Sequence, residues 1–250
     1  MDRVHYSFDE LFVADEYLYF MADTLREENT AAQVDFIERA LALGPQSRVL
    51  DLGCGHGRHT NELARRGHEA CGVDIVGGFL EVARRDAASL GVASTFAQAD
   101  LRAFRTERPF DCALLLFDVV GFFEDEENEQ ILHNAFTALV PGGKLLLDLR
   151  TREAVARAPA ASVVDKGNGD MMVDQLSFDV ASGRAIDQRT FIRGGVVRSI
   201  SFSVRLYTFT EMRSILRAIG FEVTAAYGGY ADTPPSLARP RTLIVATRPG

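Results

Sequence analysis

The sequence predicts an α/β fold built on a mostly parallel, seven-stranded sheet with one antiparallel insertion. Short apolar runs alternate with amphipathic helical segments from residue 48 to residue 149, which is typical of strands joined through helices. After residue 155 apolar side chains recur at every second position, the period of a strand with one wet face. The 250 residues, 47% hydrophobic and 25% charged, favour one folded domain.

The first two thirds of the chain predict the parallel part of this sheet. Residues 1–43 read as helices and are expected to form an N-terminal helical lid, and Gly44 ends them. Strands are then expected at 48–52, 69–73, 94–97, 111–117 and 143–149, with helices at 58–66, 78–90 and 125–139. Right-handed crossovers through helices make such strands parallel.

The last third predicts the insertion and the end of the sheet. Leu176, Phe178 and Val180 alternate with polar neighbours, which indicates about three antiparallel strands that cover the substrate. Thr208 and Glu211 form a capping-box pattern for a helix at 209–219, followed by strands at 221–227 and 242–247. The expected parts are the lid (1–43), the cofactor-binding core (44–154), the insertion (155–207) and a C-terminal helix and hairpin (208–250).

Charge and composition exclude several classes of function. The net charge is −8 with a pI near 5.2, and no run of Lys and Arg could neutralise a row of phosphates, which argues against a nucleic-acid substrate. No stretch reaches 18 apolar residues, and the acidic N-terminus lacks a signal-peptide pattern. The three cysteines lack the paired spacing of a zinc site or a disulfide framework. We therefore expect a cytoplasmic protein with reduced thiols and no membrane partner.

A glycine-rich turn at residues 51–57 predicts the type of cofactor. Glycines let the backbone approach a ligand closely because no Cβ intrudes. A dinucleotide fingerprint would need a third glycine at position 58, which is Arg58. Asp51 would repel a pyrophosphate but suits a ligand that carries an ammonium or sulfonium group. The turn therefore favours S-adenosylmethionine (SAM) and disfavours an NAD-binding dehydrogenase.

Two further acidic residues follow the next two predicted strands. Asp74 stands 23 residues after Asp51, where a carboxylate can accept hydrogen bonds from both ribose hydroxyls, and Ile75 beside it would pack on adenine. Asp100 could accept a hydrogen bond from the adenine amino group, with Leu101 as apolar cover. The alternatives are a solvated strand-end carboxylate for Asp74 and a turn or helix cap for Asp100.

With these residues, the chain resembles the class I SAM-dependent methyltransferase family over residues 48–149. The resemblance is carried by the string Cys-Gly-His-Gly-Arg-His at 54–59, the pair Phe110-Asp111, and Pro141-Gly142-Gly143. It implies a Rossmann-like methyltransferase sheet with SAM as methyl donor and S-adenosylhomocysteine (SAH) as product. It also implies that Asp51, Gly53 and Gly55 lie along the methionine part of SAM, and that Asp74, Ile75, Asp100 and Leu101 hold the adenosine.

The acceptor is less sharply indicated. Where DNA amino-methylating relatives carry Asn/Asp-Pro-Pro-Tyr/Phe, residues 117–120 read Phe-Asp-Val-Val, and no Asp-Asp-Asn cluster for a catalytic metal is present. The layout resembles small-molecule N-methyltransferases that act on amino acids, aminosugars or lincosamide-type antibiotics. We therefore predict methylation of a small-molecule amine in antibiotic biosynthesis, without a metal ion.

Aromatic residues are the candidates for catalysis. An amine needs positioning and desolvation more than a strong base. The resemblance places Phe117 at the transferring methyl, where it also contacts the cofactor, and Tyr6 and Tyr17 lie in the predicted lid. The tyrosines could instead only fasten the lid helices. His56 and His59 could orient the substrate or accept a proton.

Several alternatives stay open. Asp118 and Asp148 follow strand interiors, and either could bind an amino group. The same scaffold could methylate oxygen or carbon, or could bind SAM for regulation without turnover. The sequence does not fix the substrate, the pathway or the oligomeric state, and a homo-oligomer is compatible with it.

Overall fold

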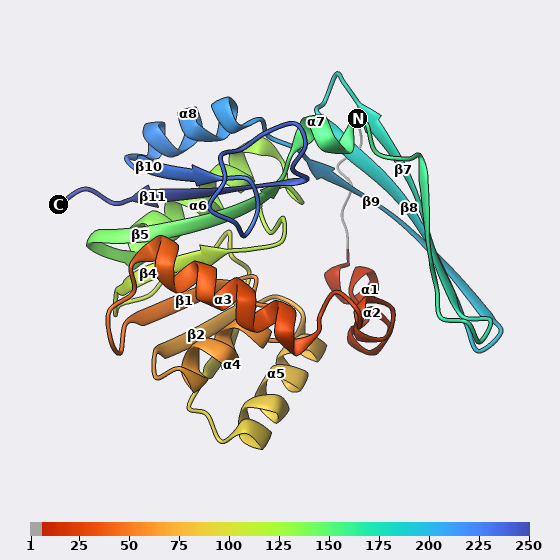
Figure 1. Ribbon diagram of the computed structural model, residues 1–250, viewed down its shortest axis with the longest axis horizontal. Helices are drawn as coiled ribbons and strands as arrows, with labels where there is room; N and C mark the ends of the chain where they lie inside the picture. The colour runs from red at the N-terminus through yellow and green to blue at the C-terminus, as the bar shows by residue number, and fades with distance from the viewer. Residues whose placement is uncertain (1–6) are drawn as a thin grey trace.

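The computed structural model describes residues 7–250 and has a mixed seven-stranded sheet as its centre (Figure 1). The strand order is β10-β11-β5-β4-β1-β2-β3. The strands are β1 (Arg48–Leu52), β2 (Glu69–Asp74), β3 (Thr95–Gln98), β4 (Phe110–Leu115), β5 (Leu139–Arg150), β10 (Glu222–Tyr227) and β11 (Arg241–Thr247). β11 alone runs in the direction opposite to the other six strands, so the predicted seven-stranded, mostly parallel sheet is confirmed.

Helices cover both faces of this sheet, as Figure 1 shows. One face carries α3 (Glu27–Leu41), α4 (Arg58–Arg65) and α5 (Gly77–Leu90), and the other carries α6 (Asp125–Ala138) and α8 (Phe209–Ile219). The central strands bury both of their faces, and they therefore read as continuous apolar runs. The capping box at Thr208 and Glu211 begins α8 as predicted.

One predicted boundary is wrong in detail. Pro141-Gly142-Gly143 was expected to separate a helix from a strand that begins at 143, but β5 already begins at Leu139 and contains all three residues. The pairing of β4 with β5 shifts register between Phe110 and Cys112, and Gly142 has φ +80°. The strand therefore accommodates the proline and glycines as an irregularity near its start.

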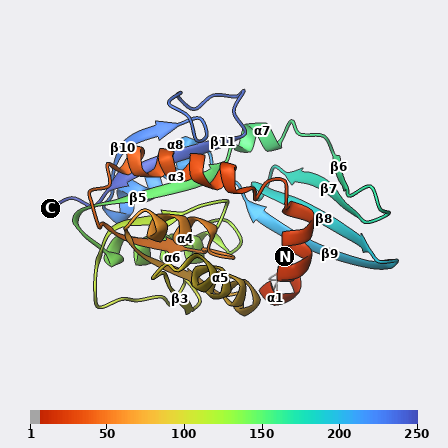
Figure 2. The same cartoon turned by 60° about the horizontal axis from the view of Figure 1, so that its bottom comes forward.

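The insertion is a four-stranded antiparallel sheet of order β6-β7-β8-β9, one strand more than expected. Its strands are β6 (Ala161–Asp165), β7 (Met171–Asp179), β8 (Arg184–Arg193) and β9 (Val196–Arg205), and the short helix α7 (Arg152–Val155) precedes them. Figure 2 shows this sheet extending sideways from the core. Among the described residues, no helix is long and apolar enough to cross a membrane.

The N-terminal helices divide between two locations. The helices α1 (Phe8–Leu11) and α2 (Ala14–Met21) lie beside the insertion, where Phe20 packs against Phe191 and Arg198 forms an ion pair with Glu16 (Figure 2). By contrast, α3 packs on the seven-stranded sheet through its buried apolar face. Of the helices that the predicted lid contains, α1 and α2 therefore pack beside the insertion, whereas α3 packs on the seven-stranded sheet.

Candidate active site

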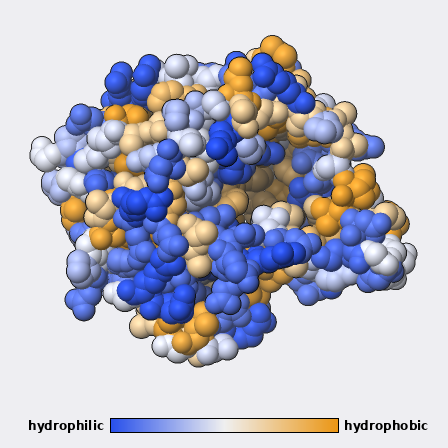
Figure 3. All heavy atoms as spheres, in the orientation of Figure 1, coloured by the Kyte–Doolittle hydropathy of each residue, from blue (hydrophilic) through white to orange (hydrophobic). Residues whose placement is uncertain are grey.

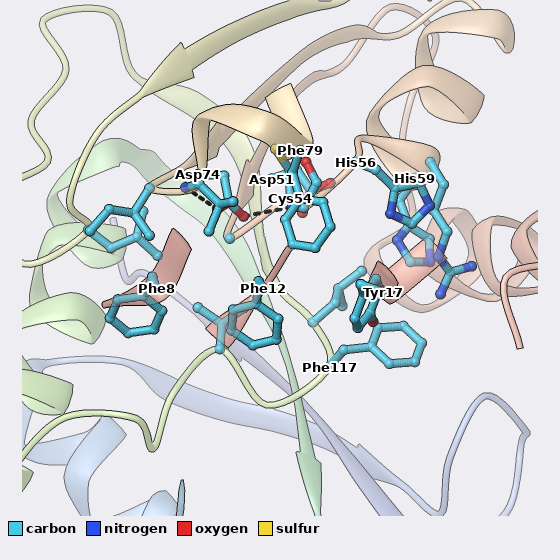
Figure 4. Close-up of a pocket in the computed structure, with 18 of the residues that line it drawn as sticks. Phe8, Phe12, Tyr17, Asp51, Cys54, His56, His59, Asp74, Phe79 and Phe117 are labelled. Carbon is cyan, nitrogen blue, oxygen red and sulfur yellow. Dashed lines mark hydrogen bonds between the residues drawn. The ribbon is translucent and has the colours of Figure 1, made fainter. Parts of the chain in front are cut away.

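A pocket opens at the carboxyl ends of the parallel strands β1, β2 and β4 (Figure 4). This is where ligands bind in open α/β sheets. Nine of the residues singled out in the sequence line it together: Tyr17, Asp51, Gly53, Gly55, Asp74, Ile75, Asp100, Leu101 and Phe117. Tyr6, the tenth, lies outside the described residues.

The glycine turn gives the pocket its tightest wall. Gly53 has φ +75°, and a Cβ there would lie 2.4 Å from a methyl carbon of Val119. Gly55 has φ +55°, and a Cβ there would meet no protein atom within 4 Å. Because Gly55 lines the pocket, that open space is available to a ligand that approaches the backbone. The turn therefore fits a closely bound cofactor.

Asp74 holds the glycine turn in place. Its Oδ2 accepts a hydrogen bond from the Gly55 N–H at 2.7 Å, and its Oδ1 accepts one from the Val76 N–H at 2.9 Å. Burial raises the pKa of Asp74, while these backbone donors lower it. A role for this carboxylate in shaping the turn was not anticipated from the sequence.

Asp51 lies buried beneath the turn, on the opposite side of the pocket from the aromatic residues of α1 and α2 (Figure 4). Thr60 donates a hydrogen bond to its Oδ2 at 2.7 Å. Burial raises the pKa of Asp51 to about 6, although the Thr60 hydrogen bond opposes this rise. A cationic ligand group beside Asp51 would favour the ionised carboxylate.

Asp100 is engaged with a neighbouring cation. Arg102 donates to both of its oxygens through Nε and Nη2, at 3.0 Å and 2.6 Å to Oδ2, and also bonds Glu127. The Arg102 guanidinium lowers the pKa of Asp100. The carboxylate expected to accept a bond from adenine is thus largely occupied, whereas Leu101 is buried as apolar cover.

An aromatic wall faces the glycine turn. Phe8, Phe12 and Tyr17 from the N-terminal helices lie along one side of the pocket, and Figure 4 shows them opposite Asp51 and Asp74. The Tyr17 ring meets Phe79 edge-on, with the ring centroids 5.3 Å apart. Burial raises the pKa of Tyr17. This wall gives the pocket an aromatic side opposite the glycine turn.

Phe117 sits in a strained turn between two guanidinium groups. It has φ +57°, a conformation that bulky residues rarely adopt. The Cζ of Arg58 lies 4.8 Å from the centroid of its ring, and that of Arg241 lies 5.0 Å from it. His59 stacks nearby, with centroids 5.7 Å apart. The strained backbone points to a functional position at the end of β4.

Arg58 is a cation without a carboxylate partner among the described residues. Its Nη1 donates to Thr30 Oγ1 at 2.8 Å and to Gln33 Oε1 at 2.7 Å, and burial lowers its pKa. In the sequence Arg58 served only to reject a dinucleotide fingerprint. Its uncompensated charge marks one end of the pocket as suited to an anionic group.

The two pocket histidines are neutral. Burial lowers the pKa of His56 to about 4 and holds that of His59 well below its usual range, and Arg58 reinforces both effects. His59 Nε2 lies 2.9 Å from Gln33 Oε1. Such weak bases suit orientation of a ligand better than proton abstraction near neutral pH.

Two carboxylates considered as amine ligands are held in an ion-pair network instead. Asp148 accepts from Arg241 Nε at 2.6 Å and from the Tyr230 hydroxyl at 3.0 Å. Asp118 pairs with Arg150 at 3.0 Å and with Arg241. These contacts leave neither carboxylate unpaired. Within residues 7–250, no group of three or more His, Cys, Asp or Glu side chains could hold a metal ion.

Comparison with known proteins agrees with this geometry. Residues 49–143 match the model of a methyltransferase domain. The cypemycin N-terminal methyltransferase of a Streptomyces species is 29% identical over 203 residues, which cover 79% of this chain and 81% of that protein. The trans-aconitate 2-methyltransferase of Paracidovorax citrulli is 28% identical and covers 89% of this chain and 94% of that protein.

A solved structure shares the whole fold. A SAM-dependent methyltransferase from Clostridium acetobutylicum superposes with a TM-score of 0.81 at 17% identity, over 95% of this chain and 98% of that one. The matched domain begins in β1, one residue after the strand starts, and spans the glycine turn, Asp74, Asp100 and Phe117. The chain therefore contains a methyltransferase domain at residues 49–143 and shares the fold of SAM-dependent methyltransferases, and SAM is the cofactor that these comparisons support.

Proposed function

We propose that the protein transfers a methyl group from SAM to an amine nitrogen of a small molecule made in antibiotic biosynthesis. The observation that carries this proposal is the aromatic enclosure of the pocket around Tyr17 and Phe117, which contains two neutral histidines and no free strong base among the described residues. An amine nucleophile needs only positioning and desolvation from such a site. The N-methylating relative from Streptomyces supports the choice of nitrogen.

Different residues of the pocket would bind different parts of the cofactor. Asp51 would pair with the ammonium and Arg58 with the carboxylate of its methionine part, while Gly53 and Gly55 allow the close approach. Asp74 would accept hydrogen bonds from the ribose hydroxyls. The adenine would lie against Ile75 and Leu101, near the edge formed by Asp100.

The transfer itself is an in-line displacement. SAM supplies a methyl group on a sulfonium: the N–C bond forms as the S–C bond breaks, the sulfur becomes a neutral thioether, and the product ammonium then loses a proton to solvent. Phe117 and Tyr17 would line the path and stabilise positive charge through their ring faces. Exclusion of water would favour the neutral amine that attacks.

One observation favours a second candidate, methylation of a carboxylate oxygen. Arg58 is a half-buried cation with no carboxylate partner among the described residues, and the trans-aconitate relative is named for an acidic substrate. If Arg58 held the acceptor rather than the cofactor, the product would be an ester. The experiment below also distinguishes the amine proposal from methyl transfer to an alcohol oxygen or to carbon, and from SAM binding without turnover.

The test supplies SAM labelled with ¹³C in the methyl group together with matched panels of amines, alcohols and carboxylic acids. SAH release measures turnover, and NMR of the product locates the label. We expect the label on nitrogen. Label on oxygen or carbon would refute the amine proposal, and SAM binding without SAH release from any panel would favour a regulatory role. An Asp74→Asn variant serves as the control for cofactor-dependent signal.

A further inference from the structure

Asp187 is a buried carboxylate that the proposed cofactor site does not use. It lies in the middle of β8 and is only 7% exposed, and its Oδ1 has no hydrogen-bond partner among residues 7–250. The nearest cation is Arg189, whose Nη2 lies 3.9 Å from Oδ2. A buried carboxylate without a hydrogen-bonding partner is unfavourable unless another group supplies one.

The neighbouring cations are committed to other acids. Arg189 donates to Asp174 through both Nε and Nη2, at 2.5 Å and 3.1 Å. Arg150 pairs with Asp118, 3.0 Å away. Around Asp174, Asp187 and Arg189 there are thus two carboxylates and one guanidinium, so this part of the sheet carries a surplus negative charge.

Asp187 lies on the face of the insertion that packs against α1 and against Phe122, a residue of the pocket wall. It stands directly across from Phe202 in the β8–β9 pairing, and paired residues project from the same face of a sheet. Phe202 stacks on Phe122, which lines the pocket, with ring centroids 6.3 Å apart. Burial raises the pKa of Tyr17 in the pocket wall, and the charges of Arg58 and Arg189 oppose that rise. Arg189, two residues from Asp187, is therefore close enough to act on the pocket. Figure 3 shows a hollow between the core and the insertion, with hydrophobic atoms in its floor.

We infer that Asp187 is an anionic subsite of the acceptor pocket, where it binds an ammonium group of the methyl acceptor other than the neutral amine that attacks SAM. This inference rests on the proposed amine methylation and names the class of acceptor further, as a molecule that presents a cationic amine to the inner face of the inserted sheet. The carboxylate would gain the partner that its Oδ1 lacks, and the surplus negative charge would be neutralised. Arg189 and Asp174 would fix the position of Asp187.

Protonation of Asp187 should switch this subsite. Burial and the charge of Asp174 raise its pKa to about 6, whereas Arg189 and Arg150 lower it. These four are the charged groups that face one another from β7, β8 and the end of β5. The carboxylate is therefore mostly ionised above pH 7 and mostly neutral below pH 5. Preference for a cation should follow that change.

The test uses cyclohexylamine and cyclohexanol as probes of equal ring size on the SAH-loaded protein, titrated by NMR at pH 7.5. We expect the wild type to bind the ammonium at least tenfold more tightly than the alcohol. Asp187→Asn should reduce the ratio to within twofold. Asp165→Asn, at an exposed aspartate on the edge strand β6, should leave the ratio unchanged. Asp187→Ser repeats the test without an amide, and SAH affinity reports correct folding.

Several outcomes would overturn the inference. They are a ratio near one in the wild type, no detectable binding of the amine, or an unchanged ratio in both Asp187 variants. If the variants do not fold, the wild type alone decides, because the ratio must fall by at least threefold between pH 7.5 and pH 5. If Asp187→Asn abolishes the preference while the labelled methyl appears on oxygen, the subsite stands and the amine proposal fails. If Asp187→Asn leaves the preference unchanged while the labelled methyl appears on nitrogen, the amine proposal stands and the subsite fails.

Discussion

Replacement of Asp74 by asparagine should weaken SAM binding far more than the same change at Asp100. The Asp74 carboxylate accepts hydrogen bonds from the backbone N–H groups of Gly55 and Val76 and has no cationic side chain bonded to it among the described residues, so it retains lone pairs for a ligand. Asp100 is held by the fork of Arg102. The two acids stand at successive strand ends and line the same pocket, which makes them a matched pair.

The magnitude follows from the bonds that are lost. A hydrogen bond to a charged acceptor contributes about 1.5–3 kcal/mol, so loss of the ribose contact at Asp74 corresponds to roughly 10- to 140-fold weaker binding. The asparagine NH2 would also face the N–H of Gly55 or Val76, which loosens the glycine turn. At Asp100 the half-exposed pair with Arg102 contributes only about 0–1 kcal/mol, so the expected loss stays below about fivefold.

Titration calorimetry with SAM and with SAH measures both variants against the wild type. Thermal unfolding shows whether each variant remains folded at the temperature of the titration. Equal losses at the two positions would refute the reasoning, because the difference in occupancy by Arg102 would then have no consequence. Unchanged affinity in Asp74→Asn would place the ribose elsewhere.

Three further predictions concern the glycine turn and the aromatic wall. SAM affinity should rise from pH 5 to pH 7, because the ammonium group of SAM favours ionised Asp51; calorimetry in two buffers should detect the release of up to one proton on binding. Without ligand, the Asp51 pKa near 6 in the folded protein makes the free energy of unfolding fall as pH rises from about 4 to 6. Asp51→Asn should abolish both effects. Phe117→Leu and Tyr17→Leu should lower kcat about 10- to 100-fold and change the Kd of SAM by less than about threefold, since these aromatic rings position the acceptor. Unchanged kcat would leave them as packing residues. Gly53→Ala should lower the free energy of unfolding by about 1–3 kcal/mol in chemical denaturation, and Val119→Ala should partly restore it by removing the 2.4 Å clash.

Burial explains why most strands could be predicted from the sequence. Residues such as Leu50 in β1 and Leu114 in β4 are fully buried, so their strands appear as uninterrupted apolar runs. The edge strand β6 (Ala161–Asp165) escaped prediction because four of its five side chains are exposed and the fifth is half-buried. A strand with no buried face leaves no periodic signal, and its pairing with β7 depends on the tertiary structure.

The chemistry of the site was only partly readable for a related reason. Glycine spacing and acids at strand ends depend on local chain direction, so the sequence alone is enough to place Gly53, Gly55 and Asp74 in one pocket. The partner of each charge depends on folding in three dimensions. Contacts between distant segments decide that Arg102 occupies Asp100 and also reaches Glu127, and that Arg58 has hydrogen-bond partners in α3 but no carboxylate among the described residues.

The pairing of buried charges separates structural from ligand-binding positions in this molecule. Arg241 pairs with both Asp118 and Asp148, and Arg150 pairs with Asp118, so this network of two acids and two cations balances its own charge. Arg58 has no carboxylate partner among the described residues, and Asp187 has only Arg189, 3.9 Å away; burial of each disfavours its charged form. Burial of the Arg58 and Asp187 charges destabilises the folded protein. Ligands that bring an opposite charge to each should stabilise it, because a ligand that binds only the native state shifts the unfolding equilibrium. SAM and a cationic acceptor should therefore raise the melting temperature additively, and Arg58→Gln should remove only the share due to SAM.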